Sequence, residues 1–351
     1  MKDATTFSAS DWLALKEGSA RTIFEGSPDQ IRELYRKLVR HWHPDRNADP
    51  QASDVFVHLK ALYGHALALA GGKTAVLNDT SVWVEEVVDH QGHRFRLNAQ
   101  AQEPFELGTF LRGKATLAYK GGPEHADLFA NFAQRAKSLR FASAAMKKQM
   151  KPLLPDLHAH PWGTSGGILV LKRDPEAVRL RDVMNHYRRH AAVVPAEHVA
   201  WIVSGLFHLA CYLEHIGIAH HAIGADSVWI VPERHTVHLW GGWFYAKAYG
   251  ETLQALPTEA ADMAGHRYLS QKTAAPGIDR SLIRALGREL LGDRRGQRLA
   301  ATVAPKPFID ALLLPAGASA VEDYRAWKEV LTASFGPPKF VPMAIRSSNL
   351  Y

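Results

Sequence analysis

Trp42-His43-Pro44-Asp45-Arg46 closes a basic, amphipathic segment that begins near Pro28. The apolar residues of this segment recur at the spacing of one helix face, and they are Ile31, Leu34, Tyr35, Leu38 and Trp42. Ser27 is a candidate N-cap, with Pro28 in the first turn, where the missing N–H of proline costs nothing. Pro44 disfavours helical geometry at His43, so we expect the helix to end there.

A second amphipathic segment follows the residues Asn47, Asp49 and Pro50, which are typical of a turn. Its apolar residues again fall at helical spacing, and they are Val55, Phe56, Leu59, Leu62, Tyr63, Ala66 and Leu67. Gly71-Gly72 is expected to end this segment. Two such helices can bury their apolar faces only against each other. The sequence therefore predicts an antiparallel helical hairpin with residues 43–50 at one end.

The first helix of the hairpin also carries a cationic face. Its basic residues are Arg32, Arg36, Lys37 and Arg40, and Glu33 is the only acid between Ile31 and Trp42. One interpretation is an ordinary solvated helix surface. The other is a docking face for an acidic partner, whose attraction should weaken as salt is added.

These residues resemble a J domain, the signature module of DnaJ-type co-chaperones, over about residues 5–70. The resemblance rests on the basic helix, on His43-Pro44-Asp45 with Arg46, and on Phe56, Leu59 and Tyr63. It implies that the cationic face and His43-Pro44-Asp45 bind a DnaK-type chaperone and trigger its ATP hydrolysis. The alternative for His43 is a helix C-cap. A further helix is expected either at Ser10–Glu17, with Ser10 as N-cap, or near Arg21–Phe24.

Composition places the chain among soluble globular proteins. Its 351 residues, 46% of them hydrophobic, are enough for two or three domains. Cys211 is the single cysteine, and no signal peptide or run of about 18 apolar residues is present, so we expect a cytoplasmic protein without a membrane partner. Residues 1–72 hold nine basic and nine acidic side chains, so the net charge of +7 arises beyond them.

After residue 72 the pattern becomes strand-like and then helical. The expected strands are a hairpin within residues 78–100, two strands at 105–113 and 114–120, and one at 168–171. A helix is expected at 126–150, a central helix at 199–215, a β-ribbon at 228–231 and 237–240, and helices at 278–291 and 320–334.

This order of elements is similar to that of a protein kinase, with residues 218–230 in place of the catalytic loop His-Arg-Asp-x-Lys-x-x-Asn. The resemblance implies a multidomain α+β chain, in which an all-α J-domain hairpin precedes a two-lobed kinase-like domain. The expected parts are a J domain at 1–72, a linker and first strand at 73–92, a small lobe at 93–172 and a helical lobe at 173–351.

The residue types differ from those that phosphoryl transfer needs. Ala222 stands at the position of the catalytic aspartate, Gly224 at the loop lysine and Ser227 at the magnesium-binding asparagine. Trp240-Gly241-Gly242 replaces Asp-Phe-Gly. Lys120 is either the counterpart of the strand-three lysine or a solvated lysine, and the helix after it offers no glutamate to pair with it. We therefore expect a pseudokinase with no catalytic residue, in which Asp226 is a turn residue and not a displaced acid.

Other sites have little support. The histidines at 158, 160, 215, 220 and 221 lack metal-ligand spacing, so no metal and no cofactor are expected. The basic clusters Arg188-Arg189 and Arg294-Arg295 lack interleaved aromatic residues, which makes nucleic acid an improbable partner. The leading hypothesis is a co-chaperone whose kinase-like domain binds an unknown client. An active atypical kinase and a nucleic-acid adaptor are the alternatives.

Overall fold

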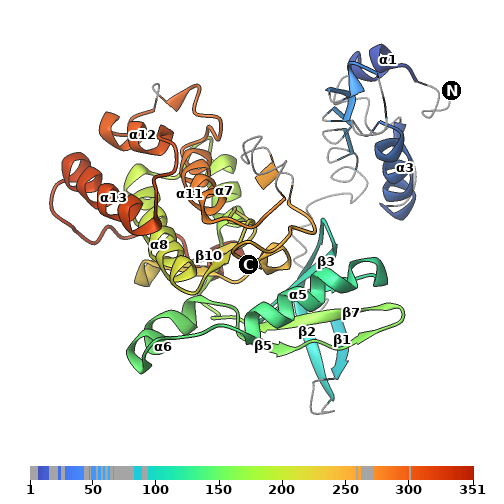
Figure 1. Cartoon of the computed structure of the whole chain (residues 1–351), viewed down its shortest axis with the longest axis horizontal. Coiled ribbons are helices and arrows are strands. Elements are labelled where there is room, and N and C mark those ends of the chain that lie inside the picture. The colour runs from blue at the N-terminus through green and yellow to red at the C-terminus, as the bar shows by residue number, and fades with distance from the viewer. Residues whose placement is uncertain are drawn as a thin grey trace. The chain divides into compact units, whose positions relative to one another are not determined.

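The chain divides into two compact units, Met1–Ser81 and Val82–Tyr351, and each is described by itself (Figure 1). The computed structural model describes residues 7–15, 23–24, 28–42, 47, 49–52, 54–56, 58–59, 62–63, 66, 83–88, 94–257, 260–261, 272–299 and 302–351.

The first unit begins with the short helix α1 (Ala9–Leu13), whose N-cap is Ser8. The Ser8 hydroxyl accepts from the Asp11 N–H at 3.2 Å, and the Asp11 carboxylate accepts from the Ser8 N–H at 2.9 Å. This reciprocal capping box satisfies two N–H groups that a helix start leaves unpaired. A helix is therefore present in the stretch where Ser10–Glu17 is predicted, but its N-cap is Ser8 and not Ser10, and residues 16–17 lie outside the described residues.

Helix α3 (Pro28–His41) begins and ends close to where the sequence predicts. The residues 52, 54–56, 58–59, 62–63 and 66 are also helical. The apolar faces of the two predicted helices and α1 form one core. Its buried members are Ala9, Trp12, Phe24, Ile31, Leu38, Trp42, Ala52, Val55, Leu59, Leu62 and Ala66. The rings of Tyr35 and Tyr63 stack at 3.8 Å across it. The apolar faces of the two predicted helices are therefore buried against each other, as predicted.

The second unit has a sheet with the strand order β1-β2-β3-β4-β7-β5, and β6 also pairs with β7. The strands are β1 (Trp83–Val88), β2 (Arg94–Phe105), β3 (Gly108–Gly113), β4 (Thr116–Gly121), β5 (Leu157–Ala159), β6 (Trp162–Gly163) and β7 (Gly166–Lys172). The hairpin β1–β2 confirms the predicted pair of strands. Phe105, however, ends β2 and does not begin the next strand. Gly108 starts β3 with φ +146°, and a Cβ there would lie 2.1 Å from the Lys120 carbonyl oxygen.

Two helices replace the single helix expected at residues 126–150. After η3 (Pro123–His125) comes α5 (Ala126–Lys137), and α6 (Ala144–Met150) and η4 (Lys151–Leu153) follow a break. The break has a local cause, because the Ser138 hydroxyl donates to the Arg135 carbonyl and the Ser143 hydroxyl caps α6 by accepting from the Met146 N–H at 3.1 Å.

The large lobe is built around α8 (Ala196–His215), as predicted, and α8 packs against α11 (Pro276–Leu290) and α13 (Ala320–Phe335). Its other helices are α7 (Leu180–Arg189), η5 (Pro232–Arg234), η6 (Trp243–Tyr245), α12 (Lys306–Leu313) and α14 (Ser347–Leu350). Its strands are β8 (Val178–Arg179), β9 (Ile218–Ala219), β10 (Val228–Val231), β11 (Thr236–Leu239) and β12 (Lys247–Ala248). The predicted ribbon is the antiparallel pair β10–β11.

Among the described helices, only α8 is long and apolar enough to cross a membrane by length and composition. The interior of the unit buries 61% of its apolar window, as in the core helix of a globular fold.

A buried ion pair joins two helices of the large lobe. The Arg284 guanidinium of α11 lies 2.7 Å from the Asp323 carboxylate of α13, and the side chains are 9% and 6% exposed. The Gly317 N–H also donates to Asp323 at 3.0 Å. Removal of Asp323 would therefore leave a buried arginine without its counter-charge.

We expect Asp323→Ala to lower the free energy of unfolding of the second unit by about 3–5 kcal/mol, because an uncompensated buried charge remains. Urea denaturation of the full chain measures this. The matched control is Asp310→Ala, which removes the exposed Lys306–Asp310 pair of α12. It should change the free energy by less than about 1 kcal/mol. Equal effects of the two substitutions would contradict the prediction.

Candidate functional site

The predicted chaperone-binding residues lie on α3 and just beyond it. His43, Pro44 and Asp45 lie outside the described residues, and Arg32, Arg36 and Arg40 are described only as backbone positions of α3. The Lys37 ammonium lies 2.9 Å from the Glu33 carboxylate, and both side chains are about two-thirds exposed (64% and 67%). Such an exposed pair contributes little to stability. The binding role of these residues stays a prediction.

The described residues on either side of residues 43–46 are held by local hydrogen bonds. The Asn47 amide donates to the His41 carbonyl at 3.1 Å, at the end of α3. The Asn47 side-chain oxygen accepts from the Asp49 N–H at 3.0 Å, and the Asp49 carboxylate accepts from the Gln51 N–H at 2.8 Å. Trp42 is buried in the core of the unit. The chain on both sides of residues 43–46 is thus anchored, as the turn residues predict.

The loop at residues 220–227 of the second unit is held by a buried carboxylate. Asp279 of α11 accepts from the backbone N–H groups of His220 and His221 at 2.7 Å each. Nε2 of His220 lies 3.0 Å from the Gly241 carbonyl oxygen, and Nδ1 of the same ring accepts from the Ala222 N–H at 3.3 Å. The ring is therefore a neutral tautomer with its proton on Nε2. This loop lies between β9 and β10, where the sequence predicts it.

The positions at which the kinase pattern is lost make packing contacts. Gly242 has φ +79°, and a Cβ there would lie 2.9 Å from the Ala222 Cβ. The Ser227 hydroxyl accepts a hydrogen bond from the Gly224 N–H at 2.9 Å and donates one to the Gly224 carbonyl at 3.1 Å. The Trp240 ring is buried against His238 and Trp229, with centroids 4.5 and 5.9 Å away. These side chains supply no carboxylate with which to hold magnesium or a proton.

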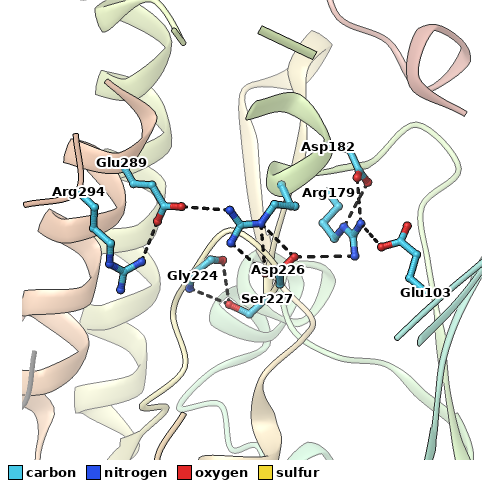
Figure 2. Close-up of polar contacts among 9 residues, drawn as sticks. Glu103, Arg179, Asp182, Gly224, Asp226, Ser227, Glu289 and Arg294 are labelled. Carbon is cyan, nitrogen blue, oxygen red and sulfur yellow. Dashed lines mark hydrogen bonds and ion pairs between the residues drawn. The ribbon is translucent and has the colours of Figure 1, made fainter. Parts of the chain in front are cut away.

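Asp226 lies in a network of ion pairs and not in an acid's position. The Arg181 guanidinium lies 3.0 Å from Asp226 and 3.1 Å from Glu289, whose second partner is Arg294 at 2.8 Å (Figure 2). Arg179 pairs with Asp182 of α7 at 2.9 Å and with Glu103 of β2 at 2.6 Å. Burial by itself lowers the pKa of Arg179, but these carboxylates raise it above its ordinary value. Glu103 and Arg179 thereby link the two lobes.

Lys120 lies on the face of β4 that is opposite to α5. Side chains alternate across a strand, and β4 directs Leu117 and Tyr119 into the core that α5 covers. Ala118 belongs to the core on the opposite face, so Lys120 shares that opposite face and is exposed. A lysine that pairs with a helix glutamate in a kinase must face the helix. Tyr119 has that direction here and Lys120 does not, and a contact of Lys120 with a nucleotide stays a prediction.

Aromatic rings fill the space between α5 and the segment that follows Gly242. Phe244 of η6 is 2% exposed, and its ring contacts those of Phe129 and Phe132 of α5 at centroid distances of 4.9 and 4.8 Å. The rings of Tyr119 and Phe105 lie 5.3 and 5.8 Å from it. Aromatic side chains from β2, β4, α5 and η6 thus form one buried cluster beside Tyr119.

Two polar contacts hold this segment closed. The Asn131 amide of α5 donates to the carbonyls of Phe244 and Ala246 at 3.0 and 2.9 Å. The Tyr245 hydroxyl donates to the Glu106 carboxylate at 2.9 Å. Glu106 lies in the turn between β2 and β3, which corresponds to the glycine loop of kinases. The turn and the segment after Gly242 are therefore tied together.

The comparisons with known proteins agree with this geometry. Residues 25–65 match the DnaJ domain family. The chain carries a J domain. Over 46 residues the chain is 44% identical to DnaJ homolog subfamily C member 16 of Rattus norvegicus, covering 13% of this chain and 6% of that protein. It is 49% identical over 39 residues to Chaperone protein DnaJ 1 of Aromatoleum aromaticum, covering 11% of each. The similarity thus covers a small part of the relatives' length.

The second unit has a two-lobed protein-kinase-like fold. The structure of vaccinia related kinase 3 superposes with a TM-score of 0.50 over 71% of this chain and 90% of that chain, at 12% identity. At this identity the similarity shows the fold alone. The predicted order of a J domain followed by a kinase-like domain is confirmed.

Sequence reasoning missed several residues that shape the kinase-like site. Tyr119 follows from the alternation of β4 once its buried face is known, but Asn131, Asp279 and Glu106 bond to partners more than 50 residues away along the chain. In the described part of the chain, no group of three histidine, cysteine or acidic side chains could hold a metal ion.

We expect the second unit to lose stability as the pH falls from about 6.5 to 5. Burial lowers the pKa of His220 to about 3 and that of His238 to about 4. The unfolded chain binds protons at both rings below their ordinary pKa, whereas the folded chain does not, so acid favours unfolding. Below the ordinary histidine pKa, each of these histidines should lower the free energy of unfolding by about 1.4 kcal/mol for every unit that the pH falls.

Urea denaturation at several pH values measures this slope. His238→Asn keeps a donor near Pro152 but cannot titrate, so it should remove the contribution of His238 to the slope. His215→Asn, at an exposed histidine, serves as the control and should leave the slope unchanged. A slope that is the same in His238→Asn and in the unmodified chain would refute the prediction.

Proposed function

We propose that this chain is a J-domain co-chaperone that stimulates the ATPase of a DnaK-type chaperone. The observation that supports this most is the match of residues 25–65 to the DnaJ domain family, because that range contains His43-Pro44-Asp45 and the whole basic face of α3. The tip carries a titratable ring and a carboxylate, and its flanks are anchored by Asn47 and Asp49.

We further propose that the kinase-like domain is catalytically inactive. Phosphoryl transfer requires a base, magnesium ligands and a lysine on the phosphates. Ala222 packs against Gly242 at the position of the base, and Trp240 is buried at the position of a metal ligand. Tyr119 faces α5 where the lysine would, and Phe244 fills the adjoining space. The domain would then serve as an adaptor for a client protein in the cytoplasm.

An atypical kinase and a nucleic-acid adaptor have less support. Asp226 could act as a displaced acid only after release from Arg181, which lies 3.0 Å away. Of the basic clusters, Arg294 is paired with Glu289, and this removes part of the free positive charge that phosphate contacts need. No observation on the described residues favours either function over the adaptor.

The co-chaperone proposal is tested by the substitution His43→Gln. We expect it to reduce stimulation of a DnaK-type chaperone's steady-state ATPase to near the unstimulated rate, because the ring that contacts the partner is lost. The matched control is His41→Gln, an exposed histidine two residues earlier, which should stimulate like the unmodified chain. If folded His43→Gln stimulates fully, the proposal fails.

The inactive-kinase proposal predicts that Mg-ATP will not raise the Tm of the second unit. A bound ligand stabilises the state it binds, so the absence of a shift at millimolar nucleotide indicates the absence of useful affinity. Lys120→Ala should change nothing, because Lys120 faces away from α5. A Mg-dependent shift that Lys120→Ala abolishes would instead support an active or nucleotide-binding domain.

A pull-down would separate the partners of the two units. Proteins captured by the unmodified chain but not by His43→Gln are expected to be chaperones. Proteins captured by both are candidates for clients of the kinase-like domain.

A further inference from the structure

The segment after α13 returns along the large lobe to the space between the lobes (Figure 1). The Phe340 ring stacks on the His235 ring at 4.1 Å, and the Val341 carbonyl is bonded to the same histidine at 2.9 Å. Met343 and Ile345 are buried in the core of the unit, and Arg346 lies 3.1 Å from Glu233. Phe340 is 59% exposed, whereas the buried Met343 and Ile345 and the Arg346–Glu233 pair hold the chain next to α14 and Tyr351.

Tyr351 contacts both lobes at that position. Its ring lies beneath the guanidinium of Arg112, with 3.4 Å between the guanidinium carbon and the ring centroid. Its hydroxyl donates to the Asp182 carboxylate at 2.8 Å and accepts from the Arg179 backbone N–H at 2.9 Å. Arg112 belongs to β3 of the small lobe, whereas Arg179 and Asp182 belong to the large lobe. A single phenol side chain thus bridges them.

Arg112 depends on this ring. Its side chain is 7% exposed, and in the described part of the chain its Nε and Nη1 have no hydrogen-bond acceptor. A buried guanidinium without acceptors is unfavourable unless another group stabilises its charge. The face of an aromatic ring does so, and the carboxylates of Asp182 and Glu103 lie close enough to act on the same charge. The ring is therefore the direct contact that compensates the burial of Arg112.

The wall of this site is rigid. Arg173, whose guanidinium carbon lies 5.2 Å from the Tyr351 ring centroid, donates to the carbonyls of Gly113, Lys114 and Ala177 at 2.8, 2.9 and 2.6 Å. Arg179 is held by Glu103 and Asp182. Arg173, Arg179 and Asp182 are thus held by bonds to residues other than Tyr351, whereas Arg112 has the Tyr351 ring as its direct contact.

We propose that the kinase-like domain contains a phenol-binding site between its lobes, formed by Arg112, Asp182 and the Arg179 N–H, which Tyr351 of the same chain fills. The guanidinium selects an aromatic ring, and the carboxylate with the N–H selects a hydroxyl that both donates and accepts. Occupancy of the site joins β3 to α7. The site does not depend on the co-chaperone activity, so the failure of either proposal leaves the other intact.

The test removes the internal ligand and supplies a free phenol to the full chain. Tyr351→Ala should lower the Tm of the second unit and make amide hydrogen exchange at residues 108–113 faster by on the order of tenfold, because the lobes lose their link. Addition of p-cresol should raise the Tm of Tyr351→Ala in a saturable manner, while the unmodified chain shows no such shift. Toluene, which lacks the hydroxyl, should give a smaller shift.

The matched control is Phe340→Ala, which removes another ring of the same segment, one that is 59% exposed and remote from Arg112. It should neither change exchange at residues 108–113 nor create a response to p-cresol. Tyr351→Phe keeps the ring on Arg112 and should have a Tm between those of Tyr351→Ala and the unmodified chain. The proposal is overturned if Tyr351→Phe melts like Tyr351→Ala, or if p-cresol shifts the unmodified chain and Tyr351→Ala equally.

Discussion

The burial of Phe244 is the constraint on which the kinase-like domain depends. Its ring contacts α5 and Tyr119, and the backbone around it is bonded to Asn131. Because protein interiors are closely packed, this ring fixes how α5 and η6 lie against each other. The same packing ties the turn at Glu106 to the helical segment at Tyr245. The lobes are therefore held closed by side chains of the chain itself.

The two units use their charged residues differently. In the J domain, small apolar stripes bury each other, and the polar residues are left for the turn and for the surface of α3. In the kinase-like domain, charged residues are used for architecture: Arg179 joins the lobes, and Asp279 holds the loop at His220. A carboxylate bonded to two N–H groups and a guanidinium bonded to two carboxylates are strong, directional contacts. They suit a scaffold that keeps one shape.

The errors of the sequence predictions each have a local or a long-range cause. The N-cap of α1 is Ser8 and not Ser10, because Asp11 completes a capping box with Ser8, and this signal is local in the sequence. The break between α5 and α6 arises from Ser138 and Ser143, whose hydroxyls bond to the backbone. Tyr119 and Lys120 lie on opposite faces of β4, and the sequence of a strand shows its period of two but not which of its faces is covered.

By itself, the sequence determined the helical hairpin of the J domain, the order of the kinase-like elements and the absence of acids at Ala222 and Trp240. Local periodicity, capping and residue chemistry carry that information. Only the tertiary structure decided that Tyr119 faces α5, that Asp226 pairs with Arg181 and that Tyr351 lies beneath Arg112. These contacts join residues far apart in the chain, and their partners depend on which faces pack, which no local pattern encodes.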